Sequence, residues 1–350
     1  MITIKQIANE LNVSPTTVSN VIHGNYRKVS AENVERISQK LKERNYIPNM
    51  GARMLAQGGS KIIGVVMNIR YYKQESGERY EFGYKLFHST LLSVLEREIR
   101  KNDYYMMYYV SKDVNEILTV VGQWNIDGMV IHGLDEEDCC RLVQEVKKPI
   151  VFIDCAFTTE NCFSNVGLYD RYGGYLATHH FLENGHHRIG FLTYSDPPKG
   201  YIGERYEGYE QALKEYGLEA DRESIVYLSP YDEERMQIYG RLYQERERFT
   251  ALLVDSDYYA VELMSYFQDR GMQIPDEMSI IGFDNNSFSR VVRPKLTTVH
   301  QDVELKAVKA MELLQEHLQN PDQPYKRIIL PVRLIKRETV KNISENLNRF

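Results

Sequence analysis

Three aspartates stand at positions where the β-strands of an α/β protein are expected to end. They are Asp154 in VFID, Asp255 in ALLVD and Asp284 in IIGFD. In open parallel sheets, ligands bind in the crevice outside the carboxyl ends of the strands. The sequence therefore predicts a ligand site at these strand ends.

Chemistry beyond ligand binding has little support in the sequence. No expected strand is followed by GxGxxG or a P-loop, and there is no GxSxG elbow and no HExxH motif. The histidine pairs at residues 179–180 and 186–187 could suggest a metal site. Adjacent histidines, however, point to different faces of a helix, and the second pair follows Gly185 in an expected loop. We therefore expect no enzyme activity, no cofactor and no metal.

A second set of candidate residues lies in the first stretch of the chain, TIKQIANELNVSPTTVSNVI, residues 3–22. Thr3 with Gln6 predicts a capping box, and Ser14 followed by a proline predicts the start of a second helix. The outward face of this second helix carries small polar side chains and no charge. These residues are Pro15, Thr16, Thr17 and Asn20. Such a helix is typical of the one that a helix-turn-helix inserts into the major groove; the alternative is a hairpin that only packs on its neighbour.

The elements that follow fit a DNA-binding headpiece and a joint. Ser30 is expected to cap a third helix that runs through Tyr46 and stops at Pro48. Residues 49–61 are either an idle linker or contain a short helix that forms only against a partner chain and DNA. Residues 1–60 carry eight Lys and Arg against four Glu, although the whole chain has a net charge of −6. A basic N-terminal segment on an acidic body fits one surface for nucleic acid.

The composition is that of a globular protein with more than one domain. The chain has 350 residues, of which 43% are hydrophobic and 26% charged. It has no apolar run near the ~20 residues of a membrane span. Its first apolar residues belong to an amphipathic helix, which differs from a secretory signal. We therefore expect a cytoplasmic protein without a membrane partner. Its cysteines, Cys139, Cys140, Cys155 and Cys162, lack CxxC spacing and are expected to be reduced.

From residue 62 onward, short apolar runs alternate with amphipathic stretches, which predicts parallel sheets covered by helices. The expected strands are Ile62–Met67, Tyr105–Tyr109, Gly128–His132, Ile150–Asp154, Ile189–Tyr194, Ile225–Leu228, Ala251–Asp255 and Ser279–Asp284. Because roughly ten such units are too many for one sheet of usual size, we expect two α/β subdomains.

Several stretches resemble one family. TIKQIANELNVSPTTVSNVI and YIPNMGARMLA resemble the headpiece and hinge of LacI/GalR-type bacterial transcriptional repressors, and LENGHHRIGFL, ERYEGYEQAL, IIGFDN and PKLTTVHQD resemble landmarks of their effector domain. The resemblance covers nearly the whole chain. It implies an all-α helix-turn-helix headpiece (1–48), a hinge helix and linker (49–60), and an α/β periplasmic-binding-protein-like effector domain of two parallel-sheet subdomains (61–350). The subdomains are expected at about 61–160 with 292–322 and about 161–291 with 323–345.

The resemblance also implies a homodimer that binds a pseudo-palindromic double-stranded operator. The implied DNA contacts are Thr3, Lys5, Ser14, Pro15, Thr16, Thr17, Ser19, Asn20, Arg27, Ala52, Arg53 and Leu55. Many members have Arg or His where this chain has Asn20. Asn pairs bidentately with adenine whereas Arg prefers guanine, so this position bears on the operator sequence. Leu55 matches the leucine wedge that enters the minor groove; its alternative is a small hydrophobic contact in a linker.

For the effector, the resemblance implies contacts from Arg205 and Asp284, and weaker ones from Asp154 and Ser256. An Arg fork and carboxylates can bind vicinal hydroxyls directionally; their alternative is a structural ion pair across the cleft. The first cleft wall departs from the family, because this chain has the longer YYKQESGERYEFGYKLFHS. There, Phe87 and His88 match the aromatic positions by alignment from the downstream helix.

The expected function is sequence-specific transcriptional regulation: repression of sugar-utilisation genes under the control of a small effector, a sugar, bound between the subdomains. Three alternatives remain open: a purine- or nucleoside-responsive repressor, a global regulator that answers to a phosphoprotein, and a cytoplasmic sugar-binding protein or enzyme without operator binding. The C-terminal VKNISENLNRF has no sustained leucine heptads, which favours a dimer over a tetramer.

Overall fold

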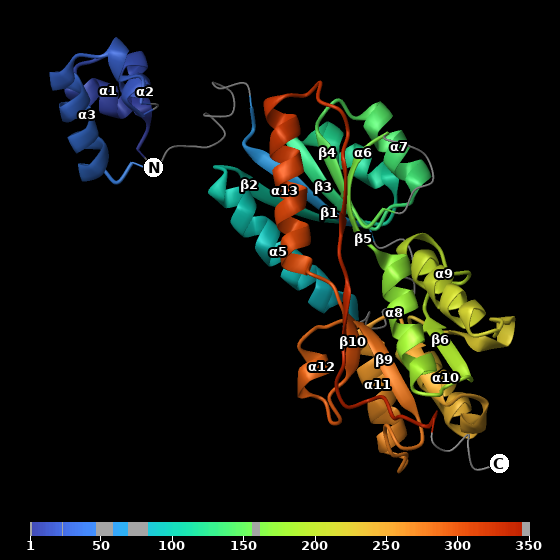
Figure 1. The fold of residues 1–350 in the computed structure, drawn as a ribbon. Helices are drawn as coiled ribbons and strands as arrows, with labels where there is room; N and C mark the ends of the chain where they lie inside the picture. Colours follow the sequence, from blue (N-terminus) through green and yellow to red (C-terminus); the bar gives the residue numbers. More distant parts are fainter. Residues whose placement is uncertain (1, 23, 47–58, 69–82, 156–161, 345–350) are drawn as a thin grey trace. The chain divides into compact units, whose positions relative to one another are not determined.

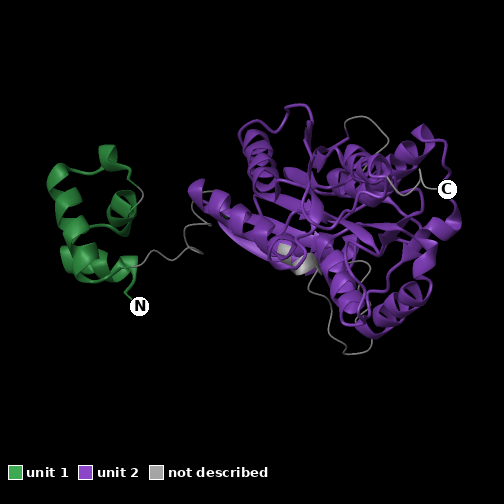
Figure 2. Ribbon diagram, turned by 60° about the horizontal axis from the view of Figure 1, so that its bottom comes forward, with its two compact units in different colours: residues 1–60 green, residues 61–350 purple. Residues whose placement is uncertain are grey.

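The computed structural model describes residues 2–22, 24–46, 59–68, 83–155 and 162–344. The chain divides into two compact units, residues 1–60 and 61–350, which Figure 2 shows in green and purple. Among the described helices, none combines the length and apolar character that crossing a lipid bilayer requires.

The N-terminal unit is a small helical domain. Its elements are α1 (Ile4–Leu11), α2 (Pro15–Ile22), η1 (Tyr26–Lys28) and α3 (Ala31–Glu43). The predicted capping box is confirmed, because Thr3 and Gln6 exchange hydrogen bonds at the start of α1. Ile7, Val18 and Ile37 bring one buried side chain from each helix into a common core.

The predicted end of α3 at Tyr46 is wrong. The helix ends at Glu43, and Arg44 caps it. Asn45 then adopts a left-handed conformation with φ of 47°, and the Tyr46 N–H donates to the Leu41 carbonyl. Asn tolerates this conformation better than most residues, so it terminates the helix three residues before Pro48.

The second unit contains two six-stranded sheets (Figure 1). The first has the strand order β11-β5-β4-β3-β1-β2 and the second β12-β10-β9-β8-β6-β7. The strands of the first sheet are β1 (Ile62–Asn68), β2 (Tyr105–Ser111), β3 (Gly128–His132), β4 (Ile150–Ile153), β5 (Ser164–Leu168) and β11 (Arg327–Leu330). Those of the second are β6 (Ile189–Thr193), β7 (Ile225–Tyr227), β8 (Ala251–Val254), β9 (Ser279–Asp284), β10 (Thr297–His300) and β12 (Arg333–Ile335).

All eight predicted strands form, with ends shifted by at most two residues, but four strands were not predicted: β5, β10, β11 and β12. The expectation of purely parallel sheets needs one correction, because β12 pairs antiparallel with β10. The central strands β3, β4 and β8 are buried throughout, since helices cover both faces of each sheet.

The helices of this unit are α5 (Gly83–Lys101), α6 (Val114–Gln123), α7 (Glu136–Glu145), α8 (Asp170–Glu183), α9 (Gly200–Glu215), α10 (Asp232–Gln244), α11 (Asp257–Gln268), α12 (Phe288–Val291) and α13 (Val303–Gln319), with the short η2 (Arg222–Ser224) and η3 (Arg246–Arg248). Successive side chains of β1 point to opposite faces of the first sheet. Val65 packs in the hydrophobic cluster with α5 and α13 on one face, and Val66 packs in the cluster with α6 and α7 on the other. Helices α8 and α9 likewise cover one face of the second sheet, and α10 and α11 the other.

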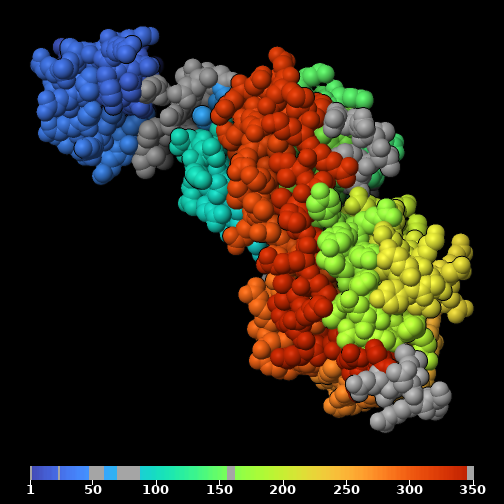
Figure 3. Space-filling model, viewed as in Figure 1, coloured from blue at the N-terminus to red at the C-terminus, as the bar shows by residue number. Residues whose placement is uncertain are grey.

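The chain crosses between the two sheets three times: after β5, after β10, and between β11 and β12. Figures 1 and 3 show the last crossing, where the red C-terminal residues run from the first sheet to the second. These crossings correct the expected subdomain boundaries. The first sheet takes β5 and β11, which were expected in the second subdomain, and the second sheet takes β10, which was expected in the first.

Candidate ligand pocket and nucleic-acid interface

A pocket lies between the carboxyl ends of strands from both sheets. Its lining residues share a mixture of acidic, aromatic and hydrogen-bonding side chains. They are Phe87, His132, Asp154, Tyr194, Tyr201, Arg205, Asp255, Ser256, Tyr259, Asp284 and Gln301. This composition suits a small polar molecule.

On the side of the first sheet, Asp154 follows the end of β4 and His132 ends β3. The Asp154 carboxylate accepts two hydrogen bonds from Lys306 Nζ, at 2.7 and 2.8 Å, and lies 3.7 Å from His132 Nε2. Burial alone would raise the pKa of Asp154, but the charges and hydrogen bonds of Lys306 and His132 together outweigh it and lower this pKa to about 2. Asp154 is therefore a carboxylate at neutral pH.

On the side of the second sheet, Asp255 follows β8 and Asp284 ends β9. Burial raises the pKa of Asp255 to about 7, although a hydrogen bond to Thr193 partly offsets it. Burial also raises the pKa of Asp284 to about 6, partly offset by the charge of Arg205. These two carboxyls therefore exchange protons near neutral pH, which is typical of functional sites.

Two of the three aspartates at the pocket also show unusual backbone conformations. Asp154 has φ of 55° and Asp284 has φ of 120°. A positive φ is uncommon outside glycine, and such residues cluster at ligand-binding positions, where the surrounding fold holds them.

Two buried polar atoms at the pocket have no hydrogen-bond partner among the described residues. They are Nδ1 of His132 and Oδ1 of Asp255. His132 is 5% exposed and Asp255 is 3% exposed, so both atoms are removed from bulk water. A buried polar atom without a partner costs free energy, of the order of 1–3 kcal/mol. One of these atoms comes from each sheet, so a ligand between the sheets could satisfy both.

Arg205 is held in place by helices α8 and α9. Its Nε donates to Asp170 Oδ1 at 2.8 Å, and its Nη1 donates to the Asp255 carbonyl at 2.9 Å. The two helices approach closely because each carries a glycine at the contact. A methyl group at Gly174 would overlap the Arg205 carbonyl, and one at Gly208 would overlap the Arg171 carbonyl. Arg205 thus lines the pocket and forms an ion pair, but its partner Asp170 lies on the neighbouring helix and not across the cleft, as the alternative had expected.

Gln301 joins the two sheets at the second crossing of the chain. Its Nε2 donates to Asp284 Oδ1, on the second sheet. Its Oε1 accepts from Lys306 Nζ at 2.9 Å, and Lys306 belongs to α13 over the first sheet. Lys306 in turn holds Asp154. A continuous polar chain therefore runs from one wall of the pocket to the other.

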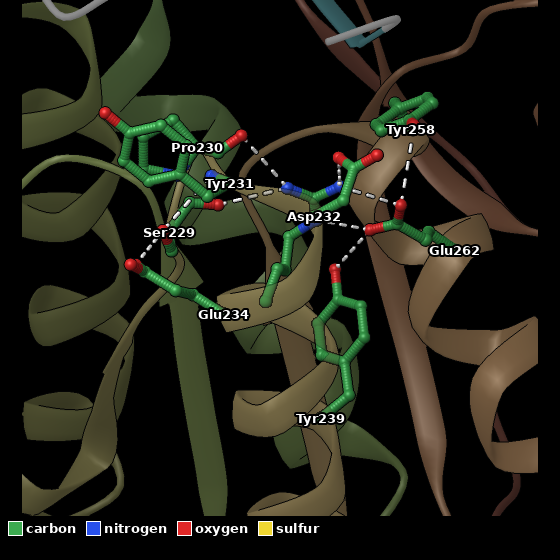
Figure 4. A network of polar contacts seen from close by, with 9 residues as sticks. Ser229, Pro230, Tyr231, Asp232, Glu234, Tyr239, Tyr258 and Glu262 are labelled. Carbon is green, nitrogen blue, oxygen red and sulfur yellow. Dashed lines mark hydrogen bonds and ion pairs between the residues drawn. The ribbon is translucent and has the colours of Figure 1, made fainter. Parts of the chain in front are cut away.

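A second polar network connects helices α10 and α11 (Figure 4). Helix α11 also carries the pocket residue Tyr259. Arg235 on α10 is fully buried and makes two hydrogen bonds to Glu262 on α11, at 2.5 and 2.9 Å. Tyr239 also donates to Glu262, at 3.0 Å, and the guanidinium of Arg235 lies 5.4 Å from the ring centre of Tyr259. The network fixes α11 against α10 behind the pocket.

In the N-terminal unit, the face of α2 presents the polar residues predicted to read bases. Pro15 and Thr16 are exposed, and Asn20 is half-buried. Thr17 is engaged locally, because its N–H and hydroxyl both contact the Ser14 hydroxyl, at 3.0 and 2.8 Å. The remaining predicted contacts within the described residues are exposed (Thr3, Lys5, Ser14, Arg27) or half-buried (Ser19). Ala52, Arg53 and Leu55 lie outside the described residues.

The comparisons with known proteins match both units. Residues 3–49 match the family model described as bacterial regulatory proteins, lacI family, and residues 178–340 match a periplasmic binding protein-like domain. The HTH-type transcriptional repressor PurR of Haemophilus influenzae strain Rd is 31% identical, covering 98% of this chain and all of that protein.

The chain belongs to the LacI family of bacterial transcriptional regulators.

Two solved structures of LacI-family proteins show the same fold. The lac repressor dimer bound to operator and the anti-inducer ONPF has a TM-score of 0.81, with 22% identity over 97% of this chain and 99% of that chain. An Enterococcus faecium LacI family regulator with bound ribose has a TM-score of 0.66, with 23% identity over 81% of this chain and all of that chain. As a member of this family, the protein is a DNA-binding transcriptional repressor and not an enzyme.

The structure brings most of the predicted effector residues together. Phe87, Asp154, Arg205, Ser256 and Asp284 all line the pocket. His88 is not among the lining residues; its ring packs edge-on against His132, with ring centres 5.3 Å apart. Ser256 also caps α11, where its hydroxyl accepts from the Tyr258 N–H at 3.2 Å.

Asp255 lines the pocket, as the pattern of strand-end aspartates predicted. The lining residues that were not predicted are His132, Tyr194, Tyr201, Tyr259 and Gln301. The strand-end pattern would also have found His132 and Tyr194, which end expected strands. Gln301, Tyr201 and Tyr259 carry no such signal, because they come from a crossing segment and from helices.

The paired histidines have structural partners. His186 Nδ1 lies 3.0 Å from the Thr250 hydroxyl, and its Nε2 lies 2.9 Å from the Lys341 carbonyl. Within the described part of the chain, no three His, Cys, Asp or Glu side chains converge as a metal site would require.

Proposed function

We propose that the pocket binds a small, uncharged, hydroxyl-rich molecule, a sugar, and that this effector controls operator binding by a homodimer. The observation that carries the proposal is the pair of unpartnered atoms, His132 Nδ1 and Asp255 Oδ1. The hydroxyl groups of one ligand can form hydrogen bonds with both atoms, one on each sheet. Such a ligand would therefore stabilise the arrangement in which the two sheets close on it.

The charges of the pocket favour a neutral ligand. Its lining contains three aspartates and one arginine, and that arginine is already paired with Asp170. A phosphate or carboxylate on the ligand would stand near Asp154, which is ionised at neutral pH. Carboxylates accept hydrogen bonds from vicinal hydroxyls, and the rings of Phe87, Tyr194 and Tyr259 can stack on the apolar face of a sugar.

A purine or nucleoside is the second candidate. Relatives at 29–31% identity are named PurR, which favours this class. A flat base could stack on the same aromatic side chains and donate its N–H groups to the aspartates. It offers fewer donors than a sugar, so it would satisfy fewer of the three carboxyl groups.

On the DNA side, we propose that α2 enters the major groove with Pro15, Thr16 and Asn20 toward the bases, with Thr17 and Ser19 nearby. Lys5 and Arg27 would contact phosphates, and Thr3 and Ser14 would lie at the same surface. The hinge positions Ala52, Arg53 and Leu55 would contact the minor groove at the centre of the operator. The target genes on this proposal are those of sugar utilisation.

We propose that the effector acts by changing the angle between the two sheets. The crossings at residues 169, 301–302 and 331–332 are the places where such a rotation can occur. Since one wall of the pocket comes from each sheet, binding in the pocket favours one angle over the other.

A thermal-shift screen with neutral sugars, sugar phosphates and purine bases tests the ligand class. A ligand that binds only the folded protein raises its melting temperature. We expect a neutral sugar to do so, and Asp255→Ala to abolish the shift while the protein still binds operator fragments in a gel shift. A shift produced only by purine bases assigns the second candidate, and a shift produced only by sugar phosphates contradicts the charge argument.

A further inference from the structure

The four cysteines of the chain lie in two pairs, in the hydrophobic cluster of the first sheet that includes α7. Cys139 and Cys140, in helix α7, each face one cysteine that follows β4 in the sequence. The Sγ atoms of Cys139 and Cys155 are 3.2 Å apart, and those of Cys140 and Cys162 are 3.0 Å apart. None of the four forms a disulfide in this structure.

We propose that the two pairs are a disulfide-forming modification site, in which Cys140 and Cys162 are oxidised first and Cys139 and Cys155 second. The order follows from exposure. Cys140 and Cys162 are half-exposed and meet an oxidant in solution, whereas Cys139 is fully buried and Cys155 is 4% exposed.

The geometry needs little change. A disulfide has an S–S length of about 2.05 Å, so each pair must close by roughly 1 Å, which side-chain rotation supplies. Each sulfur already has its partner as neighbour, so the pairing is fixed as 139 with 155 and 140 with 162. Alternative use as a metal site is not supported, because no three ligands converge among the described residues.

The reaction with hydrogen peroxide balances as two thiols and one peroxide giving one disulfide and two waters. One cysteine loses its proton and its thiolate attacks a peroxide oxygen; the O–O bond breaks, a sulfenic acid forms, and the released hydroxide takes up that proton to give the first water. The sulfur of the second thiol then attacks the sulfenic sulfur and forms the S–S bond, and the proton of the second thiol leaves with the sulfenic OH as the second water.

Burial of the α7 thiols distinguishes the two members of each pair. Cys139 donates its S–H to Cys155, whereas either sulfur of the 140–162 pair can be the donor. Burial and the hydrogen bond to Cys162 together raise the pKa of Cys140 to about 12, and burial likewise raises the pKa of Cys139. The α7 thiols therefore remain protonated at neutral pH, and in each pair we expect the cysteine that follows β4 to attack the oxidant first. Because the thiolate is the nucleophile, we expect the reaction to accelerate as pH rises.

The disulfides would tie helix α7 to the cysteines that follow β4, next to the pocket residue Asp154. Cys155 directly follows Asp154, and α7 follows His132 at the end of β3. Oxidation would therefore restrain the wall contributed by the first sheet, and on the proposed effector site it would alter the response to effector. The chemistry itself does not depend on that function.

Thiol mapping of the full-length protein tests the site without any effector. After incubation with hydrogen peroxide, free thiols are alkylated, and digested peptides are mapped by mass spectrometry without reduction. We expect the 140–162 link first and the 139–155 link later, both within one chain. Cys140→Ser should lose the first link and keep the second. Four alkylated cysteines, other pairings or links between chains would overturn the proposal.

Thermal unfolding provides a second measurement. Each link closes a loop, of 16 residues for Cys139–Cys155 and 22 for Cys140–Cys162, which restricts the unfolded chain. Oxidised wild type should melt a few degrees higher, and dithiothreitol should reverse the shift. The double variant Cys140→Ser/Cys155→Ser removes one member of each pair and should show no shift. If peroxide lowers the wild-type melting temperature, or shifts the double variant equally, the site is not as proposed.

Discussion

Asp255 and Asp154 line the same pocket, yet their surroundings move their pKa values in opposite directions. Burial raises the pKa of Asp255 to about 7, whereas Lys306 and His132 together overcome burial and lower that of Asp154 to about 2. An aspartate in an unfolded chain has a pKa of about 3.9. The folded protein therefore binds the Asp255 proton more tightly than the unfolded chain does, and the Asp154 proton less tightly.

We expect Asp255→Asn to be more stable than wild type at pH 8, by about 1–4 kcal/mol, and equal to it near pH 4. The reason is that the raised pKa of Asp255 makes the wild type lose stability as pH rises from about 4 through about 7. Urea unfolding between pH 4 and 8, without effector, measures the difference. A difference in unfolding free energy between the variant and wild type that does not change with pH would contradict the raised pKa of Asp255.

Asp154→Asn is the matched control for Asp255→Asn, and we expect it to lower the stability of the protein. Its carboxylate contributes stability above about pH 4 that is lost only as pH falls through about 2. The variant leaves the fully buried Lys306 ammonium without its counter-charge, so it should lose about 3 kcal/mol at pH 7.

Asn20 is the position where the operator preference should be set. We expect Asn20→Ala to reduce discrimination at one base pair of each half-site by about 1–3 kcal/mol. Lys5→Ala, which would remove a phosphate contact, should instead weaken all sequences equally and flatten the dependence on salt. Selection of binding sites from a randomised DNA pool measures both effects. The same selected sequence for wild type and Asn20→Ala would exclude a base-reading role.

At the scale of elements, the contact of α8 with α9 positions Arg205. A methyl group at Gly208 would overlap the Arg171 carbonyl, so the helices must separate. We expect Gly208→Ala to cost at least 2 kcal/mol in stability and to weaken effector binding through Arg205. Gly122→Ala in α6 is the control, because nothing lies within 4 Å of the added carbon and alanine favours a helix. Equal denaturation midpoints for the two variants would show that the close approach is unimportant.

The contact of α10 with α11 combines a hydrophobic cluster with an ion pair between the buried Arg235 and the partly exposed Glu262. Arg235→Met leaves Glu262 without its main partner and should cost about 3–5 kcal/mol in guanidinium unfolding. The double variant Arg235→Met/Glu262→Met also removes the unpaired Glu262 carboxylate, so it should recover much of the lost stability. If the double variant instead loses as much stability as the two single variants added together, Arg235 and Glu262 act independently.

At the scale of the whole molecule, Gln301 connects the two sheets where the chain crosses between them. We expect Gln301→Ala to retain operator binding and the thermal shift with the sugar found in the screen. The effect of that sugar on operator affinity, a coupling of typically 5–150-fold, should decrease. Titration of operator DNA with and without the sugar measures it, and Gln319→Ala, on the exposed end of α13, is the control. If the sugar changes the operator affinity of Gln301→Ala as much as that of wild type, Gln301 does not transmit the effect of the sugar.

Local sequence determined much of this protein. The capping box of Thr3 and Gln6, the eight strands that were predicted and the alternation of strands with helices depend on residues close together in the chain. The residues of the headpiece and the landmarks of the effector domain were sufficient to place the chain in its family. The three aspartates at strand ends located the pocket, because the carboxyl ends of parallel strands meet at one edge whatever their order in the sheet.

The tertiary structure decided what depends on partners far away in the sequence. β5 and β10 contain polar residues and become strands by pairing inside a sheet, and the three crossings determine which sheet each strand joins. Gln301 and Tyr259 enter the pocket from a crossing segment and a helix, for which no local pattern exists. The cysteine pairs are likewise separated by 16 and 22 residues, and only the packing of α7 brings their sulfurs together. Periodicity and capping act within a few residues, whereas a pocket is formed by side chains whose proximity depends on the whole fold.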